Sequence, residues 1–490
     1  MWTFVLTLTL VLLLFLLLLL TCISRTRSGD EPPLDKGRVP WLGHALNFQR
    51  DAAKFLAEMK KKHGDIFTVC AAGHYITVLL DPNSYDAVLY DSDSLGYCGQ
   101  KTLQMVFGLN LTNHNRAEEK RWMGQCFHGA KLESLSRSMY RNLQVLLGSA
   151  EMVHNLNEWK EDQLFNFCYS LLFKAGYLTL FGTEHNSSDR ELATIYKEFR
   201  TFDGLIAKLA RSALKSGEKR VANSVRKRLW DLLSPPMQSE IGAACSWQED
   251  YRQYLEDSGV DKETQRRAML LQLWITQCNA GPAAFWLLGF LLTHPQAMQA
   301  VQREMDSLQQ QAPASELPYL DSQGSTPVFD SVLSETLRLT AAVLISREVK
   351  QDVMLNLADG RSFRLRRSDR VCLFPHLSPQ MDPCIHQEPE KFKFDRFLNK
   401  DGTKKNDFFK GKSRLKYFTM PWGAGTNVCI GRDFATSTIK QFVFIVLTCF
   451  DVELSDPNSS MPPPNTVRCG FGMLQPKGDL NIRYKRKALL

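Results

Sequence analysis

The sequence predicts a mainly α-helical protein with small β-sheets, attached to a membrane by an N-terminal helix. Three observations lead to this prediction. Residues 2–23 are almost uniformly apolar, helical periodicity fills most of the chain, and only short stretches are rich in β-formers. With 490 residues, of which 44% are hydrophobic, the chain can bury a large core. Length alone suggests about two to four domains.

Charge and cysteine usage exclude several classes of protein. The net charge of +8 is mild for this length and suits an anionic membrane surface or acidic partners better than nucleic acid. The 12 cysteines are scattered, with no CxxC pair. This usage indicates reduced, cytosolic thiols instead of a disulfide framework. We therefore expect no nucleic-acid partner.

Residues 1–24 are predicted to form a transmembrane signal anchor, because the apolar run is long enough to span a bilayer. No basic residue precedes it and no small-x-small cleavage site follows, which argues against a cleaved signal peptide. Arg25 and Arg27 follow directly, so the positive-inside rule places the rest of the chain in the cytosol. We expect a single-pass protein of the endoplasmic reticulum membrane. The Pro-rich residues 25–40 are predicted to be a stiff hinge.

Two hairpins and one long helix are predicted in the remaining chain. Residues 66–69 and 75–80 indicate one hairpin, and residues 354–357 and 362–365 indicate a second. Residues 261–292 read as a single helix that is apolar nearly all round and therefore buried. Pro282 has no N–H for the carbonyl of Cys278, so we expect a kink there.

A basic amphipathic segment covers residues 207–232. Such a segment is typical of a solvated helix face, and it would also suit a second contact with the membrane. The sequence leaves both interpretations open.

The stretch most informative about function is the glycine-rich loop at residues 421–431, which reads PWGAGTNVCIG. Its glycines permit tight turns and a close approach of the backbone to a flat group. Cys429 precedes a predicted helix over residues 432–447, where free N–H groups and the helix dipole favour a thiolate. A thiolate is a good axial ligand for haem iron. A single cysteine is more often an inert buried thiol, but the spacing of Trp422, Gly425, Cys429 and Gly431 argues against that role.

This spacing, aromatic-x-x-Gly-x-x-x-Cys-x-Gly, resembles the haem-binding loop of the cytochrome P-450 superfamily. Glu335-x-x-Arg338 and the residues 394–397, FDRF, precede the loop in the superfamily's order. The resemblance implies the P-450 fold, with residues 41–490 as one large haem-thiolate catalytic domain. It implies haem b (iron protoporphyrin IX) as cofactor and Cys429 as the axial ligand of its iron. It also implies a structural triad, Glu335, Arg338 and Arg396, that holds the loop beneath the haem with its buried charges paired.

Two departures from the superfamily pattern bear on the chemistry. The central helix aligns at residues 278–282, where Gly281 replaces the acid and Pro282 the threonine that normally deliver protons to iron-bound dioxygen. An enzyme that never splits O2 could tolerate both replacements, although sterol hydroxylases of the superfamily also carry proline there. Asn427 stands where a basic residue usually holds a haem propionate. The resemblance then favours Arg347 as the propionate partner, with weaker candidates in Lys120, Arg121 and Trp122.

The resemblance extends through most of the chain to the branch of the superfamily that rearranges prostaglandin endoperoxides. It implies an isomerase that converts prostaglandin H2 into prostacyclin by haem-iron-mediated O–O cleavage, without O2, NADPH or a reductase. It also implies functional coupling to a cyclooxygenase in the same membrane. The alternative is a sterol hydroxylase, a haem-thiolate monooxygenase of the bile-acid synthesis type. A non-catalytic haem carrier or gas sensor is a further alternative.

Asn279 is the polar candidate for the substrate site. Its amide could donate a hydrogen bond to an oxygen of the peroxide bridge, or it could cap the carbonyl freed by Pro282, and the sequence leaves both open. By family position, apolar residues line the rest of the lipid pocket, and any of them could equally belong to the core. These candidates are Trp274, Ala280, Ala342, Val343, Leu344, Phe471 and Met473.

Overall fold

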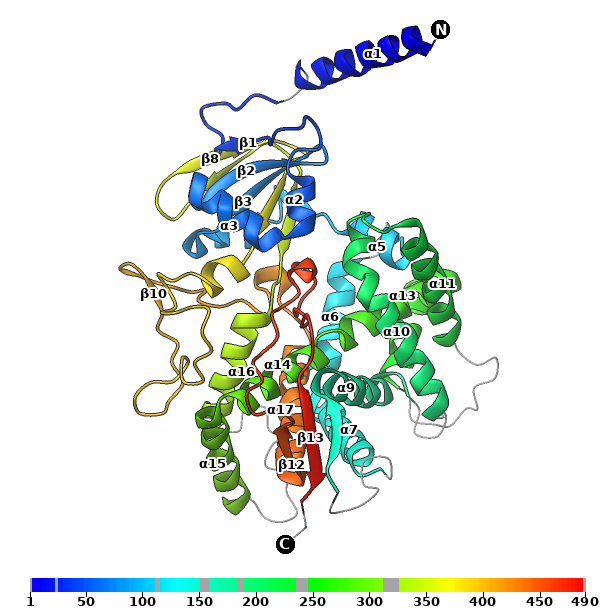
Figure 1. Ribbon diagram of the computed structural model, residues 1–490, viewed down its shortest axis with the longest axis vertical. Coiled ribbons are helices and arrows are strands. Elements are labelled where there is room, and N and C mark those ends of the chain that lie inside the picture. The colour runs from blue at the N-terminus through cyan, green and yellow to red at the C-terminus, as the bar shows by residue number, and fades with distance from the viewer. Residues whose placement is uncertain are drawn as a thin grey trace. The chain divides into compact units, whose positions relative to one another are not determined.

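The computed structural model of the chain describes residues 2–22, 25–110, 115–149, 158–182, 189–234, 246–311 and 326–487. The chain forms two compact units. Unit 1 comprises Met1–Cys98, Ala342–Pro389 and Asp407–Val428, and unit 2 comprises Gly99–Ala341, Glu390–Asn406 and Cys429–Leu490. Unit 2 is mostly helical and unit 1 holds most of the strands, which confirms a mainly helical protein with small sheets (Figure 1).

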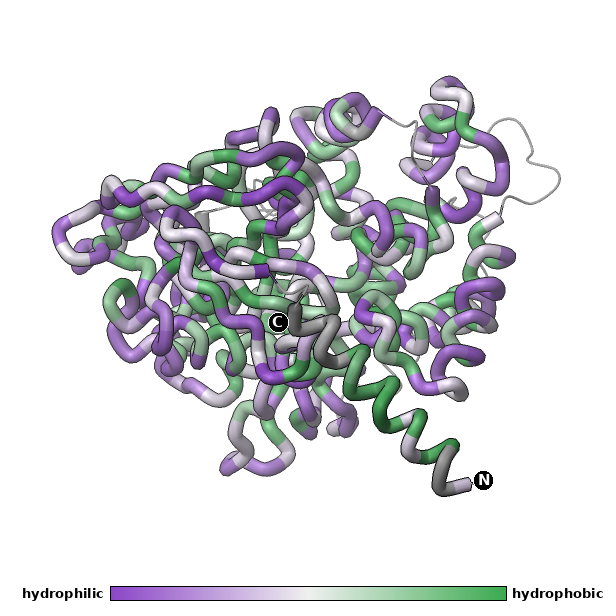
Figure 2. Tube along the Cα trace, turned by 90° about the horizontal axis from the view of Figure 1, so that it is seen from above, coloured by the Kyte–Doolittle hydropathy of each residue, from purple (hydrophilic) through white to green (hydrophobic). Residues whose placement is uncertain are grey.

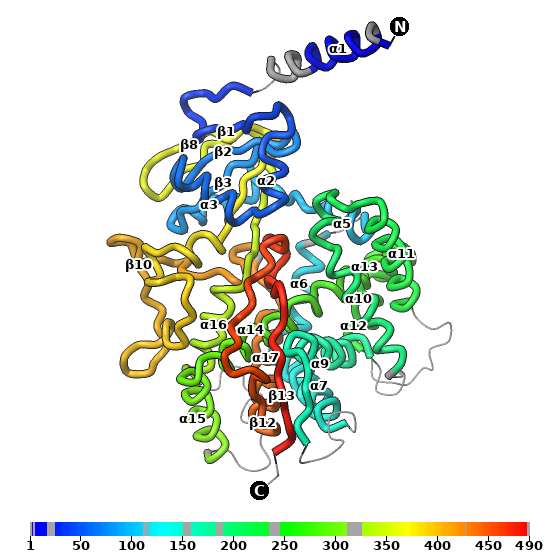
Figure 3. Tube along the Cα trace, in the orientation of Figure 1, coloured from blue at the N-terminus to red at the C-terminus, as the bar shows by residue number. Residues whose placement is uncertain are grey.

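Unit 1 is organised around a six-stranded sheet with the order β1-β2-β3-β9-β6-β4. Figure 3 shows its early strands in blue beside strands from the middle of the chain in yellow, because β3 pairs in parallel with β9. The antiparallel pairing of β2 with β3 and of β7 with β8 confirms the two predicted hairpins. The strands of this unit are β1 (Leu34–Asp35), β2 (Ile66–Ala71), β3 (His74–Leu79), β4 (Leu95–Tyr97), β6 (Ile345–Val349), β7 (Val353–Asn356), β8 (Ser362–Leu365), β9 (Arg370–Leu373), β10 (Phe409–Lys410) and β11 (Ser413–Arg414).

Short helices accompany this sheet. One of them, α3, has Asp51 as its N-cap residue. The Asp51 side chain accepts a hydrogen bond from the Lys54 amide at the start of the helix. The helical elements of unit 1 are α1 (Trp2–Cys22), α2 (Ala45–Arg50), α3 (Ala52–His63), η1 (Pro82–Ser84), α4 (Asp86–Leu89), the π-helical turn η2 (His376–Gln380) and η3 (Gly425–Asn427).

The N-terminal helix α1 carries an apolar stretch, Val5–Leu16, whose side chains are exposed. Figure 2 shows this stretch in green, the colour of hydrophobic residues. Because a soluble protein gains nothing from exposing so many apolar side chains, they require an apolar partner.

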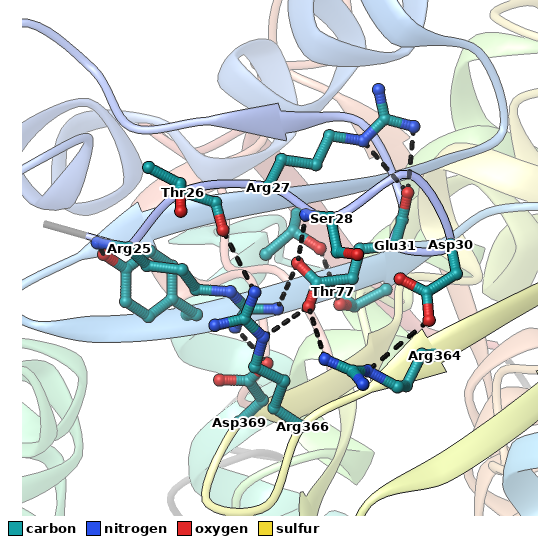
Figure 4. Close-up of polar contacts among 12 residues, drawn as sticks. Arg25, Thr26, Arg27, Ser28, Asp30, Glu31, Thr77, Arg364, Arg366 and Asp369 are labelled. Carbon is teal, nitrogen blue, oxygen red and sulfur yellow. Dashed lines mark hydrogen bonds and ion pairs between the residues drawn. The ribbon is translucent and has the colours of Figure 1, made fainter.

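A cluster of ion pairs attaches the segment that follows α1 to the sheet of unit 1 (Figure 4). Arg25 pairs with Glu31 at 3.0 Å and with Asp369, and its guanidinium lies 5.0 Å from the centre of the Tyr75 ring. Glu31 is buried and also pairs with Arg366. Burial alone would raise the pKa of Glu31, but hydrogen bonds from Arg366 and Arg25 outweigh it and hold that pKa below its ordinary value. Glu31 therefore stabilises the fold above the ordinary carboxyl pKa, and this contribution is lost as the pH falls. Burial raises the pKa of Asp369, so that carboxyl does not add to this effect.

Replacing Arg25 with alanine is expected to loosen residues 26–31, because Glu31 and Asp369 each lose a partner. Hydrogen exchange of these backbone amides should become about tenfold faster or more, since local opening then costs about 1.4 kcal/mol less. The matched control is Arg38→Ala, which removes an exposed arginine of the same hinge. Equal exchange in the two variants would contradict this role for the cluster.

Unit 2 packs its helices around α14 and α17, which contact each other, and α14 also lies against α9 and α16 (Figure 1). A three-stranded sheet, β12-β13-β5, completes the unit. The helices are α5 (Gln100–Phe107), α6 (Arg116–Cys126), α7 (Gly129–Leu147), α9 (Leu164–Leu180), α10 (Asp189–Ala210), α11 (Ser216–Leu232), α12 (Trp247–Asp257), α13 (Lys262–Gln277), α14 (Ala280–Thr293), α15 (Pro295–Gln311), α16 (Pro327–Thr340), α17 (Arg432–Cys449) and η4 (Thr466–Arg468). The strands are β5 (Lys160–Gln163), β12 (Phe450–Leu454) and β13 (Asn481–Arg486).

The long helix predicted over residues 261–292 is divided into α13 and α14 by Cys278 and Asn279. The interruption therefore lies just before Pro282, where the missing N–H releases the Cys278 carbonyl from the helical ladder. That carbonyl accepts a hydrogen bond from the Tyr169 hydroxyl at 3.4 Å. Among the described residues, the stretch Lys262–Thr293 is the one long and apolar enough to cross a membrane, but 72% of its apolar window is buried, so it is a core segment.

The basic segment at residues 207–232 is also divided, because α10 ends at Ala210 and α11 begins at Ser216. The buried residues of α11 are Ala222, Val225 and Leu229, at helical spacing. Its apolar side therefore faces the interior, and Lys219, Arg220, Lys227 and Arg228 are exposed, whereas Arg226 is half-buried and donates to the Met105 carbonyl at 2.9 Å.

Candidate functional site

The cysteine loop follows a path that its glycines make possible. Gly423 and Gly425 have φ angles of 70° and 59°, in the left-handed region that favours glycine. A Cβ on Gly425 would lie 3.1 Å from the Cβ of Leu89, so a larger residue would also collide with α4. The loop leaves unit 1 after Val428 and enters unit 2 at Cys429.

Cys429 has an exposed side chain just ahead of helix α17. Desolvation by the surrounding protein raises the pKa of its thiol, and the Gly431 backbone N–H and the charges of Arg432 and Lys120 only partly oppose this effect. That the helix start favours a thiolate stays a prediction. The helix begins three residues later, at Arg432, and the dipole acts only near the first turn. A bound metal ion would deprotonate the sulfur outright.

Gly431 is not required by the packing of the protein itself. Its φ of −84° suits any residue, and apart from its chain neighbours no atom of the described residues lies within 4 Å of where a Cβ would stand. A glycine at such a position leaves room for a flat group beside Cys429.

The three residues of the predicted triad meet in unit 2. Arg338 donates from Nε and Nη2 to the two carboxylate oxygens of Glu335, at 2.7 and 2.9 Å. Arg396 donates from Nε to Glu335 Oε2 at 2.8 Å, and the Lys393 amide donates to Oε1 at 3.0 Å. The side chains of Glu335 and Arg338 are fully buried and that of Arg396 is 6% exposed. The carboxylate is thus saturated with donors, as a buried charge must be.

Arg347 lies in β6 of unit 1 and is 6% exposed. Its Nη2 donates to the Thr426 hydroxyl of the cysteine loop at 3.0 Å, and Nη1 donates to the Ser346 carbonyl at 3.3 Å. No acidic side chain among the residues that the structure describes forms an ion pair with it. Burial lowers the pKa of Arg347. An unneutralised buried guanidinium is costly and suits an anionic group such as a carboxylate of a bound ligand.

The weaker candidates for a propionate contact lie on α6. Arg121 is exposed, and Trp122 stacks on Tyr254 with ring centres 5.0 Å apart, which is a packing role. Lys120 is half-buried, and its charge acts on Cys429. The side chain of Asn427 lies outside the part of the chain whose side chains the structure describes.

Asn279 lies at the junction of α13 and α14, and its side chain is held by the C-terminal part of unit 2. Its Oδ1 accepts a hydrogen bond from the Met473 amide at 3.0 Å. It does not cap α14, and the carbonyl freed by Pro282 is served by Tyr169 instead. The Nδ2 group has no acceptor among the described residues, so it is the free donor of this side chain.

Gly281, at the position of the family's acid, is fixed by close packing. A Cβ there would lie 2.4 Å from Cδ2 and 2.8 Å from Cα of Tyr169 in α9. No side chain, acidic or otherwise, fits at this position without displacing the backbone of α9.

The apolar candidates divide between the units. Trp274, Ala280, Phe471 and Met473 lie in unit 2, and the indole N–H of Trp274 donates to Asp203 at 2.9 Å. In unit 1, Ala342 is fully buried and Val343 packs against the core beside the sheet, whereas Leu344 is half-buried.

Sequence reasoning missed Asp203 and Arg468, which form a buried ion pair in unit 2 at 2.6 Å. One signal was available for Asp203. It lies on α10 among Phe199, Phe202 and Ile206, which are buried at helical spacing, and a carboxylate on an apolar stripe requires a partner.

Comparison with known proteins adds independent findings. A family model described as Cytochrome P450 matches residues 32–482. The chain is 48% identical to "Prostacyclin synthase" of Homo sapiens and of Rattus norvegicus, over 94% of this chain and 95% of each relative. It is 41% identical to "7-alpha-hydroxycholest-4-en-3-one 12-alpha-hydroxylase" of Oryctolagus cuniculus, over 95% of both chains. The solved structure "Retinoic acid bound cyanobacterial CYP120A1" matches with a TM-score of 0.72 at 19% identity, covering 94% of this chain and all of that one.

Proposed function

The chain belongs to the cytochrome P450 family, and from this premise we propose that it is an isomerase that converts prostaglandin H2 into prostacyclin without O2, NADPH or a reductase. The observation that carries the proposal is the higher identity to prostacyclin synthases than to a sterol hydroxylase, over nearly the whole chain. The reaction rearranges atoms only. One O–O bond breaks, one C–O bond forms, and a proton lost from carbon balances the proton gained by the second oxygen.

The family implies a haem cofactor, and we infer haem b. Two observations on the chain fit this group: the open space beside Gly431 and the buried Arg347 without an acidic partner among the described residues. Cys429 would bind the iron through its sulfur, and Arg347 would pair with a propionate. When bound, a haem with a thiolate ligand supplies an iron centre that favours O–O cleavage. The Glu335 triad would hold the chain around the ligand in a fixed position.

The chain's own residues favour an isomerase over a monooxygenase. A monooxygenase needs a path that delivers protons to oxygen, and Gly281 offers no proton donor. Pro282 does not separate the two activities, because sterol hydroxylases of the superfamily also carry proline there. The contact between Gly281 and Tyr169 leaves no room for the usual acid. Asn279 instead offers an N–H donor whose direction is fixed by the Met473 amide. Such a donor can bind and orient one oxygen of the peroxide bridge.

The proposed activity is tested by incubating the purified holoenzyme with prostaglandin H2 in the absence of reductase and NADPH. We expect prostacyclin as the product. A strict requirement for NADPH and O2, with turnover of a sterol, would establish the hydroxylase alternative. Absence of turnover with any lipid would instead favour a haem carrier.

Replacing Asn279 with aspartate is expected to lower kcat by about 10- to 100-fold, because one hydrogen bond of about 1–3 kcal/mol is lost. Aspartate keeps an oxygen acceptor for the Met473 amide but has no N–H donor, so the variant separates donation to substrate from support of the fold. Asn279→Ala should lose at least as much activity. If both variants bind haem and turn over substrate at the wild-type rate, Asn279 does not donate a hydrogen bond to the substrate.

The remaining parts of the proposal concern the membrane. The exposed apolar stretch of α1 supports residues 1–24 as an anchor. Residues 25–40 as a hinge and residues 41–490 as the catalytic domain are the further parts of this proposal. We propose that the anchor lies in the endoplasmic reticulum membrane with the catalytic domain in the cytosol. A lipid endoperoxide would then reach the enzyme from a cyclooxygenase in the same membrane.

A further inference from the structure

A buried carboxylate in unit 2 accepts hydrogen bonds from four side chains on three separate segments of the chain. Asp203 Oδ1 accepts from Trp274 Nε1 at 2.9 Å and from Arg468 Nη2 at 2.6 Å. Its Oδ2 accepts from the Tyr169 hydroxyl at 3.0 Å and from Gln475 Nε2 at 2.7 Å. We call these five residues the Asp203 network. It connects α9 and its neighbours α10 and α13 to the chain around residues 468–475 (Figure 1).

Arg468 connects this network to Met473. Its Nη1 donates to the Asp203 carbonyl at 3.1 Å while Nη2 holds the carboxylate, so the guanidinium is fixed by two bonds. Its Nε then donates to the Met473 carbonyl at 3.2 Å. Arg468 is 4% exposed, so solvent does not compete for these bonds.

The fixed backbone of Met473 in turn holds the side chain of Asn279. The Met473 amide donates to Asn279 Oδ1 at 3.0 Å, which decides where the Nδ2 donor points. The contact is close. A Cβ on the neighbouring Gly472, whose φ is 84°, would lie 2.4 Å from Asn279 Oδ1. A small movement of this chain segment would therefore rotate or displace the carboxamide.

We propose that Asp203 and Arg468 are positioning residues, which act through Met473 to fix the direction in which Asn279 presents its amide N–H to the substrate peroxide. This inference rests on the proposed function for its substrate, but the geometry that it describes is a property of the chain. Neither residue touches the substrate.

The decisive variant is Arg468→Lys. Lysine keeps the charge that Asp203 requires, but it lacks the planar guanidinium that reaches Asp203 and Met473 at once. Contacts of Leu474 with Thr340 and Trp286 remain, so the segment should loosen without unfolding. We expect kcat for prostaglandin H2 to fall about tenfold, because one hydrogen bond to the substrate is weakened. KM and the carbon-monoxide spectrum of the holoenzyme should be unchanged.

Two controls separate positioning from stability. Arg200→Lys keeps a positive charge near Asp203, and among the described residues Arg200 forms no hydrogen bond or ion pair with residues 468–475, so this variant should leave kcat unchanged. In an Asn279→Ala background, Arg468→Lys should lower kcat no further, because its effect passes through Asn279. An additive loss in the double variant, or wild-type kcat in Arg468→Lys, would overturn the proposal.

Hydrogen exchange of the Met473 amide in the holoenzyme provides a test without any substrate. Both Arg468→Lys and Asn279→Ala should accelerate this exchange about tenfold, and Arg200→Lys should not. Unchanged exchange in Arg468→Lys refutes the positioning role even if the proposed reaction is correct. Accelerated exchange in an enzyme that does not convert prostaglandin H2 would refute the proposed function instead. If Arg468→Lys yields no holoenzyme, Asp203→Asn, which keeps the shape of the carboxylate, replaces it with the same expected outcomes.

Discussion

Replacement of Cys429 with alanine is expected to abolish conversion of prostaglandin H2, with a loss of at least about three orders of magnitude in kcat/KM, or about 4 kcal/mol. Alanine has no sulfur to give electron density to the iron, so the O–O bond loses the donor that promotes its cleavage. The reduced, carbon-monoxide-treated protein should lose its thiolate-type spectrum. Absorbance spectra and product analysis on the same preparation measure both effects.

Cys384→Ala is the matched control for this variant, because Cys384 is also an exposed free cysteine and lies outside the loop at residues 421–431. It should keep both the spectrum and the activity. A thiolate-type spectrum that survives in Cys429→Ala would show that another group ligates the iron, and the assignment of the loop would be wrong.

Replacement of Glu335 with alanine is expected to destabilise the folded protein by about 3–5 kcal/mol. The reason is that Arg338, which is fully buried, and Arg396, which is 6% exposed, would both lose their carboxylate. An unpaired buried guanidinium costs far more than the pair contributes when intact. Denaturant unfolding of the holoenzyme measures the change, and retention of haem is followed in parallel.

The control for Glu335→Ala is Asp359→Ala, which breaks an exposed pair with Arg361 at 2.7 Å. Such a pair contributes at most about 1 kcal/mol, because water solvates both groups and salt screens them. If both variants unfold at the same denaturant concentration, the triad is not the structural support that its burial indicates.

Features set by local sequence were predicted correctly. The hairpin of β7 and β8 follows from two β-rich stretches around a two-residue turn signal, and both strands pair as expected. The start of α17 directly after Gly431 follows from the end of the glycine-rich loop. Glu335 and Arg338 meet because a spacing of three residues places them on one helix face.

Features that depend on distant residues could not be predicted. Asp203 and Arg468 are 265 residues apart in the chain, and no periodicity relates them. The partner of the Asn279 side chain depends on Met473, 194 residues later, so the choice between its two predicted roles remained open. The pKa of Cys429 is raised by desolvation, which depends on how surrounding segments pack. The hydrogen-bond partner of the carbonyl freed by Pro282 is likewise distant, because Tyr169 lies 109 residues before Cys278.

The central claim is that this member of the cytochrome P450 family rearranges a lipid peroxide and takes no oxygen atom from O2. It is tested most directly by incubating the holoenzyme with prostaglandin H2 under ¹⁸O2, without reductase or NADPH, and analysing the product by mass spectrometry. The account predicts prostacyclin that contains no ¹⁸O and forms equally well under nitrogen. Incorporation of ¹⁸O, or a product that forms only when O2 and NADPH are present, would contradict it.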